Sequence, residues 1–595
     1  MRKCCGSDAR PWVRFPLDPA ISNPARKRQC LPTVNLKPNA ASVPRHRLPW
    51  LRSPAMPKKC VTKHKKYRDA SSYQPPTPSH QPRPLAGTTV GAMISLDGSH
   101  LTFDELQRVT QRDEPVQIAP AALPAMLRSR AVVEKLALGD APVYAVNTGV
   151  GLLADVRVPP EQLEQLQRNV VRSHACGVGA PLARDEVRGM MLIRANVLAK
   201  GFSGIRPLVA ERLCDLLNRG VTPVVPSQGS VGASGDLAPL AHIALVLIGE
   251  GEAEFEGARL PGGEALQRVG MEPIVLASKE GISLVNGTQA MLSVGGLQLL
   301  DAETLAESAD LICAMTIDGL RGTPRAFDPR IHQTRPFPGQ LQSAANLSRY
   351  LEGSEIRQSH ITCRRVQDAY SLRCAPQVHG AVRDALTTAR RAFEIELNSV
   401  TDNPLVIDDE IFSGGNFHGE PLALQLDAMA VALTVLAGVS ERRIDRLVNP
   451  SLNEELPPFL TNHAGLESGF MMVQVTAAAL VAENRVLAHP ASTGSITTSG
   501  NKEDFVSMGM TSAMKLKQVV RNTRHVLAIE LLTATRALDC LRPLASSPII
   551  EQTRAALAKI SPPWTADRSL SADIEATSAW IASGGVTSRC SLNPK

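Results

Sequence analysis

Residues 227–240 read Ser-Gln-Gly-Ser-Val-Gly-Ala-Ser-Gly-Asp-Leu-Ala-Pro-Leu and combine glycines, serines and an aspartate in a short stretch. A phosphate-binding loop is excluded because the pattern G-x-x-x-x-G-K-S/T is absent. One interpretation is a glycine-rich turn that caps a following helix, with Asp236 or Ser234 as the N-cap residue. This interpretation requires no chemistry beyond hydrogen bonding.

The same residues can also build an electrophile from the backbone. If the Gly235 nitrogen attacks the Ala233 carbonyl carbon, a five-membered ring closes, and loss of water, including the Ser234 hydroxyl, gives a methylidene-imidazolone. The attacking residue should be glycine because a Cβ would block the compressed backbone. The first residue should be small, the second needs a β-hydroxyl to eliminate, and Asp236 can assist proton transfers. The tetrapeptide Ala-Ser-Gly-Asp at 233–236 meets all four requirements.

The elements that would position this segment are mainly helical. Aromatic residues make up only 4% of the chain, so Leu, Val, Ala and Ile must build the core. The segment 142–151 has the β-branched run and glycine stop of a short extended segment or loop. Long Ala- and Leu-rich stretches with few turn signals predict a bundle of long helices rather than an α/β sheet. The predicted helices cover 163–172, 237–249, 291–317, 377–399, 423–447, 469–487 and 507–541.

The composition bears on partners and compartment. The net charge of +7 comes from residues 1–92, which hold 18 Lys and Arg against 3 Asp and Glu, while the remaining residues carry 46 basic and 54 acidic side chains. This mildly acidic body gives no electrostatic reason to expect nucleic acid. The 11 cysteines are scattered without metal-ligand spacing, which is typical of reduced thiols in a cytoplasmic protein. The longest apolar run, 426–439, is too short to span a membrane and predicts a buried helix.

The first 92 residues differ from the rest of the chain. They contain 15 of the 44 prolines and show neither helical nor strand periodicity, so we predict that they are disordered. Three interpretations compete: a transit peptide, which the prolines disfavour, a basic arm for nucleic acid, and a stretch that is not translated. We favour the last because ordinary patterned sequence starts at Met93. No secretory signal peptide is predicted, because no apolar stretch follows the basic residues.

Six further motifs stand in order around the tetrapeptide and give it a context. They read YAVNTGVG at 144–151, QRNVVRSH at 167–174, LVNGT at 284–288, VQDAYSLRC at 366–374, SGGNFHGE at 413–420 and EDFVSMG at 503–509. Together with Gly-Ala-Ser-Gly-Asp-Leu-Ala-Pro-Leu at 232–240, they resemble the family of histidine and aromatic amino-acid ammonia-lyases. The resemblance runs from about residue 97 to about residue 560. Seven motifs in the family's order make a simple helix-capping turn a poor explanation.

The resemblance implies elimination of ammonia from an amino acid through a 4-methylidene-imidazol-5-one formed from Ala233-Ser234-Gly235. No metal and no external cofactor are implied. Tyr144 would be the base that removes the β-proton; since a tyrosine pKa is ordinarily about 10, its neighbours must help it ionise. Arg373 would hold the substrate carboxylate in a bidentate contact. The remaining implied site residues are Asn286, Gln367 and Tyr370 around the prosthetic ring, and His174, Phe417 and Glu503 around the substrate.

The substrate prediction depends mainly on Glu503. Histidine enzymes of the family resemble this chain in having a carboxylate there, whereas phenylalanine and tyrosine enzymes have glutamine. A carboxylate pairs with an imidazole N–H but would be an unpaired charge against a phenyl ring. Histidine, converted to urocanate, is therefore the predicted substrate. The alternatives are a tyrosine or phenylalanine ammonia-lyase, a 2,3-aminomutase with the same group, and a non-catalytic scaffold. The chain departs from the family pattern at Val150, Ala369, His379, Thr497, Lys502 and Phe505.

The resemblance also implies an architecture and an assembly. It predicts a mainly α fold with an N-terminal domain, 93–290, that carries the prosthetic group, and a long-helix domain, 291–595, that completes the site in the manner of fumarase and aspartase. It implies a homotetramer in which each site takes residues from three subunits. No nucleic-acid partner and no membrane association are predicted.

Overall fold

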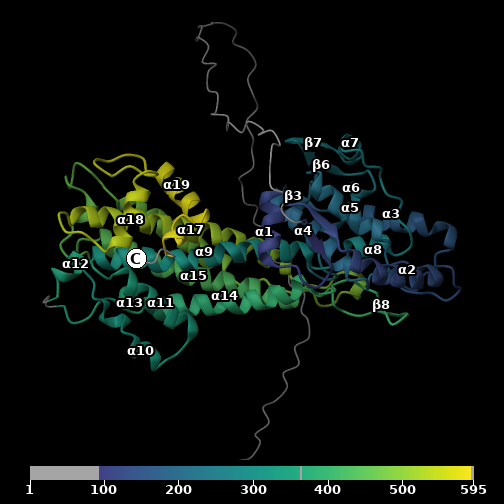
Figure 1. Ribbon diagram of the computed structural model, residues 1–595, viewed down its shortest axis with the longest axis horizontal. Coiled ribbons are helices and arrows are strands. Elements are labelled where there is room, and N and C mark those ends of the chain that lie inside the picture. The colour runs from purple at the N-terminus through teal and green to yellow at the C-terminus, as the bar shows by residue number, and fades with distance from the viewer. Residues whose placement is uncertain (1–92, 362–364, 591–595) are drawn as a thin grey trace, which may run out of the picture. The chain divides into compact units, whose positions relative to one another are not determined.

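The computed structural model describes residues 93–361 and 365–590. The chain divides into two units, Met1–Pro84 and Leu85–Lys595, and every described residue belongs to the second unit. The predictions for residues 1–92 therefore lie outside the described residues. The described part is mainly helical, which confirms the predicted fold class (Figure 1).

Five long helices form the centre of the second unit. They confirm the five long helices predicted from sequence, with boundaries that agree to within a few residues, and the longest of them extend through the unit (Figure 1). α15 packs against each of the other four. Their bounds are α9 Gln289–Gly319, α14 Ala375–Leu397, α15 Glu420–Val448, α16 Met471–Leu487 and α17 Gly509–Cys540.

Burial of Leu, Ala, Val and Ile side chains holds these helices together. α9 is buried along most of its 31 residues, so its apolar side chains are shielded from water on every side of the helix. Among the described residues, α15 alone has the length and apolar composition of a membrane-crossing helix. Its most apolar stretch is 56% buried within the unit. Contact with four other helices is typical of a core helix, as the sequence predicted for 426–439.

The N-terminal part places short helices and two- or three-stranded ladders around one end of the long helices. Its helices are α1 Phe103–Arg112, α2 Leu123–Ala137, α3 Leu163–His174, α4 Arg184–Ala199, α5 Pro207–Asn218, α6 Leu237–Leu247, α7 Gly262–Arg268 and α8 Glu280–Val285. Parallel β1 Ile94–Leu96 and β2 Val116–Ile118 form one ladder. The antiparallel ladders are β3 Val178–Pro181 with β5 Pro226–Gln228, β4 Thr222–Pro223 with β6 Glu252–Phe255 and β7 Ala258–Pro261, and β8 Leu405–Ile407 with β9 Glu410–Phe412.

Short helices also surround the other end of the bundle. They are α10 Pro329–Gln333, α11 Pro338–Tyr350, α12 Glu355–Gln358, α13 Tyr370–Arg373, α18 Pro548–Leu557, α19 Ser571–Ala582 and α20 Thr587–Cys590. Figure 1 shows α10, α12, α13 and α18 at this end, and α2, α3, α8 and β8 at the opposite end. The two ends therefore carry different short elements on shared long helices. The predicted domain boundary at 290/291 falls in the first turn of α9 and stays a prediction.

Candidate active site

The tripeptide Ala233-Ser234-Gly235 lies in a tight turn immediately before α6. Gly235 has a φ of +73°, and a Cβ on it would lie 2.2 Å from the carbonyl oxygen of Gly287. The backbone N–H of Asp236 donates to the same oxygen at 2.7 Å. No other residue type fits position 235 without moving the Gly287 backbone, which is the compressed geometry that the sequence predicted for an attacking glycine.

Asp236 occupies the N-cap position of α6, but its side chain does not cap that helix. Its carboxylate instead accepts from the Met291 N–H in α9 and from the Ser230 hydroxyl, both at 2.8 Å. The helix-capping role considered from the sequence is therefore wrong for this side chain. Burial raises the pKa of Asp236 to about 6, although both hydrogen bonds oppose the rise. A carboxyl group beside Gly235 can thus exchange a proton near neutral pH.

Two side chains hold the polar atoms of Ser234. Its hydroxyl donates to Glu503 Oε1 at 2.9 Å, and its carbonyl oxygen accepts from Asn286 Nδ2 at 2.7 Å. Glu503 also accepts from the Thr498 hydroxyl at 2.6 Å. In the described part of the chain no ion pair joins Lys502 to Glu503, although both residues line the same cavity.

A cavity of about 720 Å³ opens on Ser234 and gathers most of the predicted site residues. The sequence did not single out His418 or Asn403, which also line it. The His418 ring stacks on Phe505 with centroids 6.0 Å apart. Membership of the motif at 413–420 was the available signal for His418. The predicted residues on the cavity wall are Tyr144, His174, Ala233, Ser234, Asn286, Phe417 and Glu503.

Tyr144 lies in the loop that precedes β-bridge residue Thr148 and is partly buried. The Asn147 side chain supports this loop by accepting from the Val143 N–H at 2.7 Å. Burial raises the pKa of Tyr144, and the Glu503 charge raises it further, while a backbone hydrogen bond from Gly151 opposes both. The neighbours that this chain supplies therefore disfavour ionisation, contrary to the expectation for a base.

His174 ends α3 on the cavity wall. Its Nδ1 lies 2.7 Å from the Val170 carbonyl oxygen, which can only accept, so Nδ1 carries the proton. Nε2 is then the ring nitrogen that remains to contact a polar group of a ligand in the cavity.

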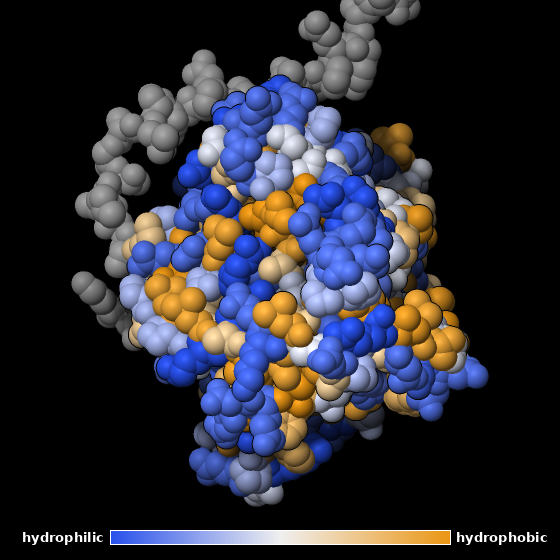
Figure 2. All heavy atoms as spheres, turned by 90° about the vertical axis from the view of Figure 1, so that its right-hand side faces the viewer, coloured by the Kyte–Doolittle hydropathy of each residue, from blue (hydrophilic) through white to orange (hydrophobic). Residues whose placement is uncertain are grey.

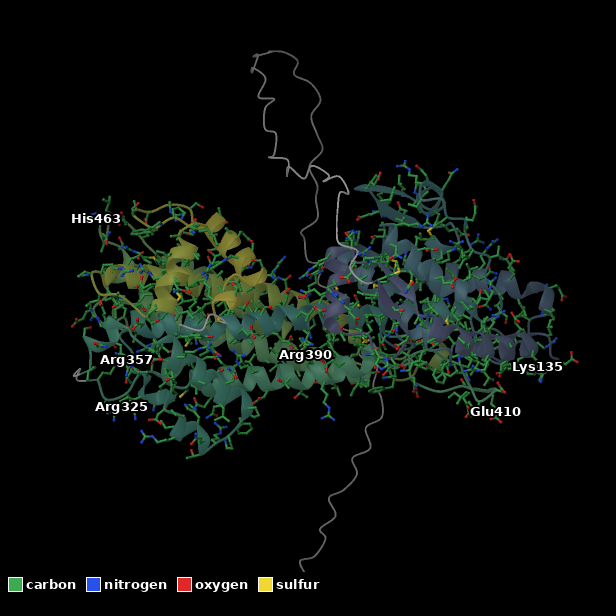
Figure 3. All side chains as sticks on the ribbon, viewed as in Figure 1. Lys135, Arg325, Arg357, Arg390, Glu410 and His463 are labelled. Carbon is green, nitrogen blue, oxygen red and sulfur yellow. The ribbon has the colours of Figure 1, made fainter. Side chains whose placement is uncertain are left out.

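Three predicted site residues are not brought to the cavity. Gln367, Tyr370 and Arg373 belong to α13 and the segment before it, at the other end of the helix bundle (Figure 1). Figure 3 shows the same separation, because Arg357 of the neighbouring α12 lies far from Glu410 of β9. Tyr370 is 71% exposed, and the Arg373 guanidinium lies 4.7 Å above its ring. Within one chain, the exposed Tyr370 and the partly buried Arg373 form a pair that is not part of the Ser234 site.

The residues that depart from the family pattern divide into two groups. Val150, Lys502 and Phe505 line the cavity, where they can affect a ligand. His379 is buried in α14, with Nδ1 2.8 Å from Asp310 and Nε2 3.2 Å from the Arg443 guanidinium. It belongs to an ionic cluster of the helix bundle and not to the cavity.

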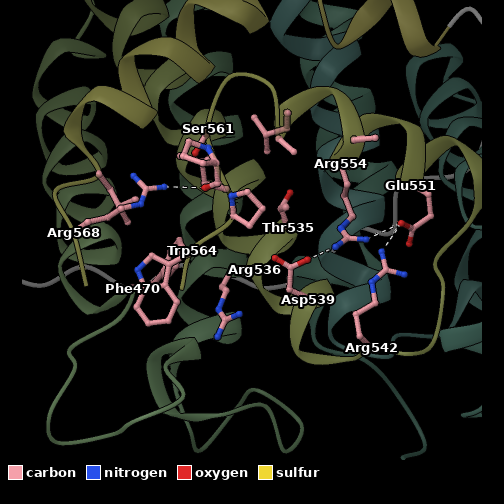
Figure 4. Close-up of a pocket in the computed structure, with 17 residues that line it drawn as sticks. Phe470, Thr535, Arg536, Asp539, Arg542, Glu551, Arg554, Ser561, Trp564 and Arg568 are labelled. Carbon is pink, nitrogen blue, oxygen red and sulfur yellow. Dashed lines mark hydrogen bonds and ion pairs between the residues drawn. The ribbon is translucent and has the colours of Figure 1, made fainter. Parts of the chain in front are cut away.

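A second cavity, of about 270 Å³, lies between α17 and α18 (Figure 4). Glu551 accepts from Arg554 at 2.7 Å and from Arg542 at 2.5 Å, and Asp539 accepts from Arg554 (Figure 4). Arg536 lies 4.8 Å above the Trp564 ring. Both carboxylates of this cavity are thus already paired with guanidinium groups, unlike Glu503 beside Ser234.

Comparisons with known proteins agree with this geometry. A family model described as aromatic amino acid lyase matches residues 101–560. Histidine ammonia-lyase of Koribacter versatilis is 58% identical over 505 residues, which covers 82% of this chain and 98% of the relative. The structure resembles histidine ammonia-lyase from Trypanosoma cruzi with a TM-score of 0.77 at 41% identity, covering 84% of this chain and 95% of that one. It resembles tyrosine aminomutase from Streptomyces globisporus with a TM-score of 0.79 at 38% identity, covering 84% and 98%. The chain therefore belongs to the aromatic amino acid lyase family.

Proposed function

We propose that this protein is a carbon–nitrogen lyase that eliminates ammonia from L-histidine to give trans-urocanate. The choice of histidine as substrate depends on the position of Glu503. Its carboxylate contacts the Ser234 hydroxyl at 2.9 Å in the same cavity as His174. Among the described residues no ion pair involves Glu503, so an imidazole N–H is a suitable partner for its carboxylate. The curated relative and one of the solved structures named above are histidine ammonia-lyases.

The residues around Ser234 fit a methylidene-imidazolone formed from Ala233-Ser234-Gly235. Gly235 is compressed against Gly287, and Asp236 can take and return the protons that ring closure moves. Such a group supplies an electrophilic exocyclic carbon, conjugated to the Ser234 carbonyl, for addition of the substrate amino group. Asn286 donates to that carbonyl oxygen at 2.7 Å and so stabilises negative charge on it. No metal and no external cofactor enter this proposal.

The other cavity residues bind and orient the substrate. Tyr144 removes the β-proton, while His174 and Glu503 contact the imidazole and Phe417 packs against it. The Asn286 Oδ1 atom is buried and has no hydrogen-bond partner among the described residues, so it is available to accept from the substrate amino group. These roles place a donor, an acceptor and a base around one substrate.

The missing part of the site comes, in this proposal, from other copies of the chain in a homotetramer. The exposed Tyr370 and the partly buried Arg373 at the far end would complete the Ser234 cavity of another copy, together with Gln367. The Arg373 charge would then counter the raised pKa of Tyr144 and bind the substrate carboxylate. The end of the unit that carries α2, α3 and β8 shows hydrophobic areas among hydrophilic ones, as an interface requires (Figure 2). We also propose a cytoplasmic location and the domain division at 290/291.

A panel of amino acids tests the substrate. Purified protein is incubated with L-histidine, L-tyrosine and L-phenylalanine, and urocanate, aryl acrylates and β-amino acids are measured. We expect urocanate from histidine and at most slow turnover of the others. Release of an aryl acrylate instead, or of a β-amino acid, would replace this proposal with the aromatic lyase or aminomutase. Phe505, an apolar ring on the cavity wall, is the residue that favours those alternatives.

A further inference from the structure

Arg194 in α4 is fully buried directly behind Asn286 and was not predicted to have a role. Its Nη1 donates to the Asn286 carbonyl oxygen at 2.8 Å and to Gln289 Oε1 at 3.1 Å. Its Nη2 donates to the Ser283 carbonyl oxygen. One guanidinium therefore joins the end of α8, the start of α9 and the residue between them that touches Ser234.

Most side chains around Arg194 are ionic. Lys279, also fully buried, donates to Asp402 Oδ2 at 3.2 Å and to the Ser283 hydroxyl at 2.8 Å. Asp402 also approaches Arg194, at 3.9 Å, so two basic side chains share one carboxylate. The adjacent Glu280 is approached by Arg206 at 2.6 Å and by Arg130 at 3.9 Å. Burial lowers the pKa of Lys279, and it lowers that of Arg194 to about 10, which leaves Arg194 charged at neutral pH.

A buried positive charge is costly unless something negative faces it. Asn286 links Arg194 to Ser234. Arg194 donates to the Asn286 backbone carbonyl, and the Asn286 side chain donates to the Ser234 carbonyl oxygen at 2.7 Å. Charges act strongly there because water is excluded. This oxygen is where the proposed reaction places electron density, so the Arg194 charge lies behind the developing negative charge as well as tying three backbone segments together.

We infer that Arg194 is a positioning residue, which fixes Asn286 against the Ser234 carbonyl oxygen and so stabilises negative charge on that oxygen. The inference rests on the proposed function. The opposing view is that Arg194 only ties backbone segments together. Arg188 provides the matched control, because it is fully buried in the same helix and donates to the carbonyl oxygens of Val109 and Leu217.

The test compares Arg194→Met, Arg194→Lys and Arg188→Met as full-length proteins. Two readouts are used: the mass of the proteolytic peptide that contains 233–235, and kcat and KM for L-histidine. We expect Arg194→Met to form the peptide that has lost two water molecules. Its kcat should fall about 100-fold while KM changes less than about threefold, as for loss of an oxyanion donor. Arg194→Lys should recover part of kcat, and Arg188→Met should lower stability but keep kcat.

Retention of wild-type kcat by Arg194→Met, an equal loss of kcat in Arg188→Met, or a full-mass peptide in Arg194→Met would each overturn the inference. If Arg194→Met does not fold, Arg194→Lys decides, with an expected fall in kcat of about tenfold from the loss of part of the guanidinium hydrogen bonding. An unchanged kcat in that variant would contradict the inference. If the wild type acts on another amino acid, the same comparison is made with that substrate, so the substrate proposal fails separately.

Discussion

Two buried ionic clusters in this chain differ in how their basic and acidic side chains are paired. In the helix bundle, Arg443 donates to Glu530 at 2.8 Å, and Asp310 accepts from Arg383 at 2.7 Å, so arginines and carboxylates occur in equal number. Behind Ser234, Arg194 and Lys279 share Asp402. The cluster that joins the helices pairs each arginine with a carboxylate, whereas beside the site two basic side chains share one carboxylate. We therefore expect the second cluster, through Arg194, to affect the reaction.

Breaking the bundle cluster should have the largest effect on stability. Glu530→Ala leaves the fully buried Arg443 without its carboxylate partner, and loss of one partner of a buried pair costs about 3–5 kcal/mol. Denaturant unfolding should show this loss, while kcat of the folded protein stays within about twofold, because the pair lies far from Ser234. A large drop in kcat with little change in stability would show that the bundle cluster takes part in turnover.

Two buried carboxyl groups, Asp236 beside Ser234 and Asp310 in the bundle cluster, should make the free energy of unfolding depend on pH in opposite directions. The pKa of Asp236 is raised to about 6 by burial, so its contribution to stability is present below pH 4 and is lost as pH rises through about 6. Burial also raises the pKa of Asp310, but the His379 hydrogen bond and the Arg383 charge outweigh it and hold the value at about 2. The contribution of Asp310 is therefore present above pH 4 and is lost as pH falls towards 2.

Asp236→Asn separates these two effects. Between pH 4 and pH 7 the wild type should lose about 3 kcal/mol of unfolding free energy, since each pKa unit corresponds to about 1.4 kcal/mol. The variant should not show this loss. Unfolding measured at several pH values gives this slope directly. An unchanged slope in Asp236→Asn would mean that the carboxyl group titrates as an ordinary surface aspartate.

The smallest change in unfolding free energy is expected for an exposed ion pair. Glu264 and Arg268 are paired at 2.7 Å on α7 with side chains 44% and 46% exposed. Glu264→Ala should change the unfolding free energy by less than about 0.5 kcal/mol, because solvent screens such pairs. A larger loss would imply that pairing as such, rather than burial, explains the cost predicted for Glu530→Ala.

The sequence predicts the long helices well because their signal is local. Repeated apolar residues with few turn residues predict α9 and α17 without reference to the elements they pack against. The types of residue at 233–236 likewise define a possible chemistry without a structure. What could not be predicted depends on distant partners: the Asp236 carboxylate binds an N–H of α9, and His379 finds Asp310 across the bundle.

Within one chain, the structure brings only part of the predicted site together. Tyr144, Asn286 and Glu503 meet at one cavity although they are far apart in sequence, and their motifs identified them. The same method grouped Tyr370 and Arg373 with them, but those residues lie at the opposite end of the bundle. A motif records that residues serve one site; it does not record whether one chain or several bring them there.

Replacement of Ser234 tests the central claim most directly. The wild-type peptide that contains 233–235 should be lighter than its sequence by two water molecules, and the protein should release urocanate from L-histidine. Ser234→Ala has no hydroxyl to eliminate, so its peptide should lack the second water loss and urocanate release should cease. A wild-type peptide of full mass, or a Ser234→Ala protein that still releases urocanate, would contradict the proposal that these three residues form the electrophile.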